Sequence, residues 1–231
     1  MRRDVEIEAG GARLGGTLSL VEGATSLVIF AHGSGSSRHS PRNQQVARAI
    51  ESAGIGTLLF DLLTREEEAA DRYTGHLRFD IDLLARRLEL ATRWAFGRGD
   101  RPIASAGYFG ASTGGAAALI AAARLQEMVG AVVSRGGRPD LAGGALAQVT
   151  SPTLLVVGED DEPVLSLNRA AYGQLRCTRE LAIVPHATHL FEEPGALEKV
   201  ADLAIEWFTR YLPGTGERGA GFAHRGAHPA A

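Results

Sequence analysis

Residues 107–115, GYFGASTGG, follow an apolar segment and place a single serine, Ser112, among small residues. They match the pattern G-x-S-x-G, in which a serine occupies a sharp turn between a strand and a helix. Such a turn strains the backbone of the serine, so Gly110 and Gly114 would remove side chains that clash two positions away. The pentapeptide alone does not distinguish a nucleophile from a serine that caps a helix.

Short apolar segments alternate with helical patterns along the rest of the chain, which predicts a mostly parallel sheet with helices on both faces. Residues 4–8 and 14–20 are predicted to form an antiparallel pair of strands. Further strands are expected at residues 27–31, 55–60, 103–109, 130–133, 153–157 and 181–184, and helices at 41–53, 78–94, 115–125, 165–175 and 197–211. Sites in such sheets form where the strands end, so the residues that follow each strand are the candidates for chemistry.

The composition is that of a globular protein, with 231 residues, 45% hydrophobic, 22% charged and a net charge of -3. We expect one domain over residues 1–213 and a disordered tail over 214–231, where the composition becomes rich in glycine and alanine. No basic block or long apolar run suggests nucleic acid or a membrane as partner, and no signal peptide is recognisable, so a cytoplasmic location is expected. The single cysteine, Cys177, excludes a disulfide framework and a multi-cysteine metal site, and no metal or cofactor is expected.

Chemistry-bearing residues follow three of the other predicted strands. A glycine-serine loop beginning at His32 follows residues 27–31, and the acidic run 159–162 and the pair His186 and His189 follow the two last strands. A loop of backbone donors, a serine, an acid and a histidine therefore come in the order that nucleophilic catalysis on this type of sheet uses. A neutral serine needs an adjacent base, and the base needs an acid to orient it, so these positions favour Ser112 as a nucleophile.

Two alternatives remain open within this set. His189 is favoured over His186 as the base, because the apolar residues that follow it can anchor its loop. Asp161 is favoured over Asp160 as the orienting acid, because the chain turns into a helix directly after it. His32 is more readily explained as a hydrogen-bonded structural histidine.

The remaining candidates would surround the reacting group. Backbone amides of Ser34 and Thr113 are expected to form an oxyanion hole. Gly33 and Gly35 are candidates for substrate binding, as is Arg135. Arg135 and Arg138 could contact a substrate carboxylate, but a structural ion pair with Asp140 or a nearby acid is the more frequent role of such arginines.

These residues resemble the α/β-hydrolase superfamily, and within it the dienelactone-hydrolase-related group. The resemblance extends to about Leu212 and rests on HGSGSSRHSPRN (32–43), residues 61–81, GYFGASTGG, SRGGRPDLAG (134–143), VVGEDDEPVLSLN (156–168) and VPHATHLFEEPG (184–195). It implies the triad Ser112, Asp161 and His189 on an eight-stranded sheet. Named members of the group carry a cysteine nucleophile where this chain has Ser112, which makes a general carboxylesterase the safer expectation.

The resemblance also bears on access to the site. Residues 135–152, where many relatives insert a helical cap, are too few for a cap domain, so we expect an open site with residues 63–78 as a partial cover. The predicted function is hydrolysis of small carboxylic esters or lactones through an acyl-enzyme, with a small-molecule ester as partner. The alternatives are an acyltransferase or perhydrolase with the same triad, and a non-catalytic ligand-binding protein on this fold.

Overall fold

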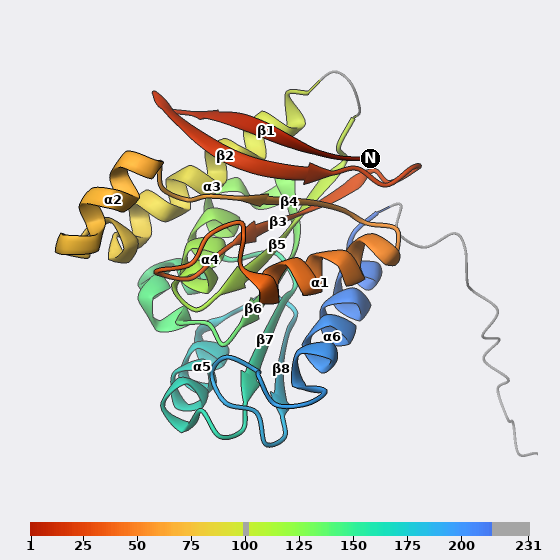
Figure 1. The fold of residues 1–231 in the computed structure, drawn as a ribbon. Helices are drawn as coiled ribbons and strands as arrows, with labels where there is room; N and C mark the ends of the chain where they lie inside the picture. Colours follow the sequence, from red (N-terminus) through yellow and green to blue (C-terminus); the bar gives the residue numbers. More distant parts are fainter. Residues whose placement is uncertain (99–101, 214–231) are drawn as a thin grey trace, which may run out of the picture.

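An eight-stranded sheet forms the centre of the computed structural model, which describes residues 1–98 and 102–213 (Figure 1). The predicted tail, 214–231, lies outside the described residues. The strand order is β1-β2-β4-β3-β5-β6-β7-β8. The strands are β1 (Arg2–Ala9), β2 (Ala12–Ser19), β3 (Ser26–Ala31), β4 (Gly56–Phe60), β5 (Ser105–Ala111), β6 (Val129–Arg135), β7 (Thr153–Gly158) and β8 (Arg179–Val184).

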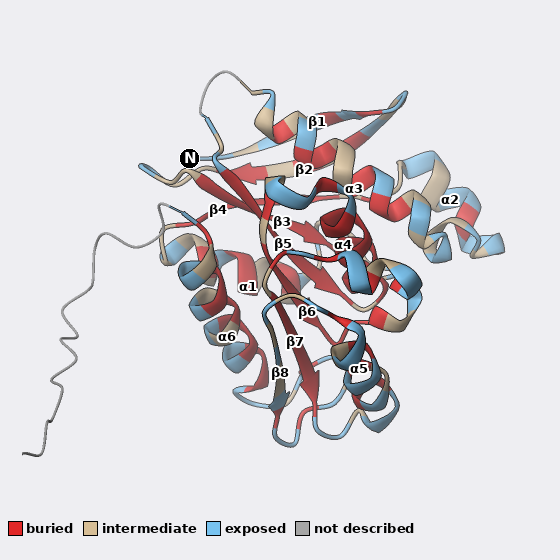
Figure 2. Ribbon diagram, turned by 180° about the vertical axis from the view of Figure 1, so that it is seen from behind, coloured by how far each residue is buried: buried red, intermediate tan, exposed pale blue. Residues whose placement is uncertain are grey.

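The predicted fold class is confirmed by how these strands pair. β2 is antiparallel to β1 and to β4, and from β4 onward in the strand order each strand is parallel to the next. Every residue of β3, β5 and β7 is buried, as expected for parallel strands covered on both faces (Figure 2). The parallel strands end at one edge, which therefore gathers the loops after β3, β5, β7 and β8.

Helices cover both faces of the sheet. Helices α1 (Pro41–Ser52) and α6 (Ala196–Tyr211) lie on one face, and α3 (Ile81–Phe96), α4 (Thr113–Leu125) and α5 (Glu162–Gln174) lie on the other (Figure 1). Each face has its own apolar core, in which side chains of the sheet pack against the helices. Tyr108 of β5 is fully buried, and its hydroxyl bonds with Thr92 of α3 at 2.6 Å, so the polar atom has a partner.

The segment 63–78, expected as a loop, contains a helix, α2 (Arg65–Thr74). Thr64 and Glu67 form a reciprocal capping box at its start, and Gly75 ends it with a φ of 67°. Only Asp71 of this helix is buried, so the apolar periodicity that reveals most helices is missing here. In the described part of the chain no cap domain separates β6 from β7, which are joined through the short 3₁₀ segment η3 (Pro139–Gln148).

Gly114→Ala is expected to lower the free energy of unfolding by about 3 kcal/mol, because a Cβ at Gly114 would lie 2.1 Å from the carbonyl oxygen of Ala31. Backbone of a buried strand cannot move aside without disturbing the sheet. Gly144→Ala is the matched control, since Gly144 is exposed and a Cβ there meets nothing within 4 Å. Urea denaturation of both variants measures the difference, and equal stabilities would contradict the packing argument.

Candidate active site

Ser112 lies on the turn between β5 and α4 with φ 51° and ψ −123°, a conformation that non-glycine residues rarely adopt. The glycines two positions away make the turn sterically possible. A Cβ at Gly110 would lie 2.5 Å from the carbonyl oxygen of Gly114, and Gly114 itself packs against Ala31. The predicted steric role of both glycines is confirmed. The N-terminus of α4 follows directly, and its partial positive charge favours negative charge near Ser112.

His189 and Asp161 meet although they are 28 residues apart in the sequence. Nδ1 of His189, in the loop after β8, lies 2.7 Å from Oδ2 of Asp161, the residue that precedes α5. The carboxylate accepts a hydrogen bond from Nδ1–H, which keeps the proton on Nδ1 and leaves Nε2 as the basic nitrogen of a neutral ring. Ser112 and His189 line the same cavity, of about 270 Å³.

The competing candidates lie elsewhere. The side chain of His186 is 91% exposed, and its backbone amide donates to the carboxylate of Glu159. Asp160 is exposed, and its amide donates to the carbonyl of Ala187. Of the acid and histidine pairs left open by the sequence, the structure joins Asp161 with His189.

His32 has the structural role expected of it. Its Nε2 accepts a hydrogen bond from the amide of Leu62 at 3.1 Å, so its Nδ1 carries the proton that bonds to the Gly33 carbonyl at 2.9 Å. Burial lowers the pKa of His32, which agrees with a neutral ring. Both ring nitrogens are used, and His32 thereby ties the loop after β3 to the loop after β4.

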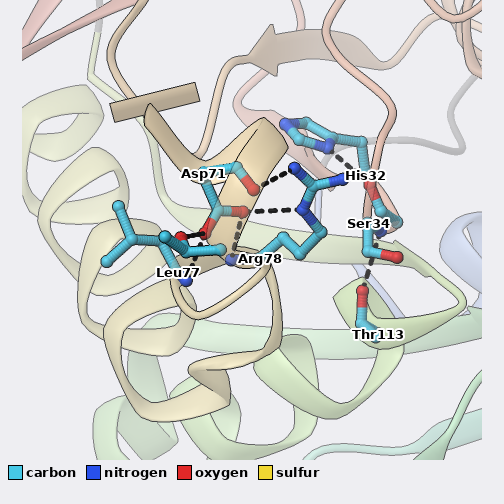
Figure 3. Close-up of polar contacts among 8 residues, drawn as sticks. His32, Ser34, Asp71, Leu77, Arg78 and Thr113 are labelled. Atoms are coloured by element: carbon cyan, nitrogen blue, oxygen red, sulfur yellow. Dashed lines mark hydrogen bonds and ion pairs between the residues drawn. The ribbon is translucent and has the colours of Figure 1, made fainter. Parts of the chain in front are cut away.

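The expected oxyanion hole differs in one donor. The amide of Ser34 donates to Oγ1 of Thr113 at 3.0 Å, so this N–H is engaged within the protein (Figure 3). Sequence reasoning placed both residues at the site but could not foresee that the side chain of one would bond the amide of the other. The amide of Thr113 opens the first turn of α4 beside Ser112, where an oxyanion donor is required.

A second cavity, of about 230 Å³, is also lined by the glycine-serine loop. Leu62, Leu63 and Leu84 give it apolar walls, and residues of α2 and of the segment after it complete the lining. Gly33 lines both cavities, which are therefore adjacent. Gly35, with a φ of 71°, lines only the second cavity.

The partial cover over this second cavity is held by Asp71 and Arg78. The Asp71 carboxylate accepts hydrogen bonds from Nε and the amide of Arg78 and from the amide of Leu77, as Figure 3 shows. Burial acts to raise the pKa of Asp71, but the hydrogen bonds from Arg78 and Leu77 outweigh it and lower that pKa to about 2. The carboxylate therefore stays ionised at neutral pH and fixes the end of α2 to the segment that follows.

The two candidate arginines after β6 have different surroundings. Arg138 forms a two-pronged ion pair with Asp140, at 2.9 and 2.7 Å, so the expected structural role is confirmed there. The same expectation is wrong for Arg135, which has no carboxylate partner among residues 1–98 and 102–213. Its guanidinium is buried and lines the cavity that holds Ser112.

Arg42 and Asn43 are among the residues of this cavity that sequence reasoning did not single out. They belong to the first turn of α1, whose N-terminus lies at the carboxyl edge of the sheet. The signal was available, because a helix that follows a parallel strand closely begins at that edge.

Comparison with known proteins shows which family has this fold and sequence. No protein-family model matches the chain. A crystal structure named dienelactone hydrolase, from Anabaena variabilis, is 57% identical, covers 92% of this chain and 98% of its own, and superposes with a TM-score of 0.90. The chain belongs to the dienelactone hydrolase family. The structure named Est1E, from Butyrivibrio proteoclasticus, has the same fold at 16% identity, with a TM-score of 0.75 over 90% of this chain and 98% of its own.

Curated relatives carry a different name. Two proteins of Mycobacterium tuberculosis, both named "Putative phosphoribosyl transferase", are 52% identical over 216 residues, which is 94% of this chain and 48% of theirs. This dienelactone hydrolase family member thus spans about half the length of the curated relatives it matches.

Cys177 does not take the place of a cysteine nucleophile in this member of the dienelactone hydrolase family. It lies before β8, at the edge of the sheet opposite to Ser112, and its thiol bonds with Thr153 at the start of β7. Burial raises the pKa of Cys177. A half-buried, protonated thiol at that edge is a packing residue.

Within residues 1–98 and 102–213, no three His, Cys, Asp or Glu side chains lie together as a metal site requires. None of the helices in those residues combines the length and the apolar character needed to cross a membrane.

Proposed function

We propose that this chain is a serine hydrolase that cleaves small carboxylic esters or lactones through an acyl-enzyme on Ser112. The observation that carries the proposal is the 2.7 Å contact between His189 and Asp161 beside a serine held at a φ of 51°. A residue in a strained conformation beside an oriented base is the arrangement that nucleophilic catalysis requires. Membership of the dienelactone hydrolase family supports the same reaction class.

The proposed reaction has two steps. Oγ of Ser112 attacks the substrate carbonyl while Nε2 of His189 takes the hydroxyl proton and then delivers it to the leaving alcohol. Water next attacks the acyl-serine, with His189 again as base, and the acid product leaves. Asp161 stabilises the imidazolium that forms in each step and is not itself protonated.

Negative charge on the substrate oxygen would be stabilised by the amide of Thr113 and the N-terminus of α4. The amide of Ser34 joins them once the Thr113 side chain turns to another rotamer and releases it. The adjacent cavity with walls of Leu62, Leu63 and Leu84 would hold an apolar part of the ester.

The transferase name of the mycobacterial relatives does not alter this proposal. That name describes proteins about twice as long, and this chain accounts for the half that has a hydrolase fold. We therefore assign ester cleavage to this chain and propose that the transferase name refers to the other half of those proteins.

Labelling with a fluorophosphonate probe tests the proposal. The probe is expected to add one phosphonyl group to the intact folded protein, located by mass spectrometry on the peptide that contains Ser112, and to abolish turnover of p-nitrophenyl acetate. A folded protein that neither takes up the probe nor cleaves the ester would instead be a ligand-binding member of the fold.

A further inference from the structure

The cavity that holds Ser112 and His189 is polar and carries positive charge. Arg42 and Arg135 both line it, and none of its lining residues is an aspartate or a glutamate. Hydroxyls of Ser34, Ser36 and Ser40 are also among the lining groups. This is far more hydrogen-bond donating capacity than hydrolysis of a neutral ester needs.

Arg135 is the most unusual of these groups. The residue is 7% exposed, and within the described residues its one side-chain hydrogen bond is a long one of 3.4 Å to Asn43, while its Nε is buried without a partner there. The ring of Phe191 lies 5.7 Å from its guanidinium carbon. Burial, and to a lesser degree the charge of Arg42, lower the pKa of Arg135 to about 10, so it remains a cation at neutral pH. A buried cation without an anion is strongly unfavourable unless a ligand supplies the anion.

Arg42 adds a second cation, whose one carboxylate partner among the described residues is exposed. Its Nε is also buried without a partner in the described part of the chain. Its Nη1 contacts Glu192 at 2.8 Å, but that carboxylate is 64% exposed, and solvent screens such a pair. The inner part of the cavity therefore retains the field of both guanidinium groups.

The N-terminus of α1 contributes to the same field. This 12-residue helix begins beside the cavity, with Ser40 as its cap and no acidic side chain in its first turn. The helix dipole favours an anion there, and helices in this orientation often bind phosphate. Arg135 supplies the independent, buried and unpartnered group that also points to an anionic ligand.

We propose that this cavity is a subsite for a phosphate group carried by the ester or lactone substrate. This inference rests on the proposed hydrolysis at Ser112 for its substrate but not for the binding of phosphate. A phosphate monoester bears up to two negative charges and three terminal oxygens, which match two guanidinium groups and the hydroxyls beside them. A carboxylate has one charge and two oxygens, so it would engage fewer of these donors.

The test measures binding of inorganic phosphate to the Ser112→Ala protein by calorimetry and by thermal shift at constant ionic strength, with acetate and sulfate in parallel. Phosphate is expected to bind and to raise Tm more than acetate does. Arg135→Met and Arg42→Met, each made in that background, are expected to weaken phosphate binding at least tenfold. Arg138→Met is the control, because Arg138 belongs to an ion pair outside both cavities, and its phosphate binding should be unchanged.

The stability of Arg135→Met separates ligand binding from a structural role. Removing an uncompensated buried charge should leave the protein at least as stable as its parent in phosphate-free buffer, whereas loss of a structural contact would lower Tm. Absence of phosphate binding, equal binding by the Arg135→Met protein, or a preference for acetate would each overturn the proposal. Phosphate binding is measured on a protein that lacks Ser112, so the result does not depend on hydrolysis. If phosphate binds but the wild-type protein has no esterase activity, the proposed function is contradicted and the phosphate site is not.

Discussion

Ser112→Ala is expected to lower kcat/KM for p-nitrophenyl acetate by about 10^4-fold or more, since it removes the group that forms the acyl-enzyme. What remains should come from binding and from the oxyanion donors, which the substitution leaves in place. Ser112 is strained at a φ of 51°, and alanine must adopt the same conformation, so the fold should be retained with little change in stability. Steady-state kinetics at saturating and subsaturating ester measure the loss, and circular dichroism verifies the fold.

Ser166→Ala provides the control for this experiment. Ser166 is an exposed residue of α5, in neither of the two cavities. Its replacement should leave kcat/KM unchanged. If the Ser112→Ala protein cleaves the ester as fast as the Ser166→Ala protein, Ser112 is not the nucleophile, and the activity belongs to another group.

The positions of Ser112, Asp161 and His189 were predictable because they depend on topology alone. Each follows a parallel strand, and parallel strands end at one edge of the sheet, so the order of strands and polar residues places the three side chains together without any coordinates. Choosing Asp161 over Asp160 was harder, because neighbouring residues on a turn point in different directions. The 2.7 Å contact with His189 makes that distinction.

Other features depend on details that a sequence does not carry. The bond between the Ser34 amide and Thr113 depends on a rotamer, and the unpaired state of Arg135 depends on which side chains face it across the α1 side of the sheet. The nearby acid Asp140 suggested that Arg135 would form an ion pair, but it is Arg138 that pairs with Asp140. Helix α2 was missed because it buries almost nothing, which removes the periodicity on which helix prediction relies.

Arg135, which has no ion-pair partner among the described residues, also bears on which substrate the site selects. Ser112 stands where the resemblance implies a cysteine in named members of the group, and this difference leaves the type of acyl group open, since serine and cysteine both form acyl-enzymes. The groups that select a substrate must then be those that line the cavity and have no partner in the free protein. Among the described residues Arg135 has no anionic partner, Arg42 has only its exposed ion pair with Glu192, and Arg138 is fully paired with Asp140.

Asp161→Asn is expected to reduce kcat for ester hydrolysis by about 10^4-fold with a much smaller change in KM. An asparagine amide at this position can donate to Nδ1 of His189, which would hold the ring in the wrong tautomer and place its proton on Nε2, facing Ser112. The size of the substituted residue is unchanged, and Asp161 lies at the start of α5 with its side chain 12% exposed, so the protein should fold.

Asp160→Asn is the matched control, because it makes the same chemical change one residue earlier, in an exposed side chain that does not contact His189. Steady-state kinetics with p-nitrophenyl butyrate compare the two proteins with the wild type. Asp160→Asn should retain wild-type kcat. Comparable losses in both variants would indicate a general effect of negative charge on this turn and would contradict a specific role for Asp161. A loss confined to Asp161→Asn is explained by the hydrogen bond to His189. The two variants make the same change of charge and size on the same turn, so they differ in that bond.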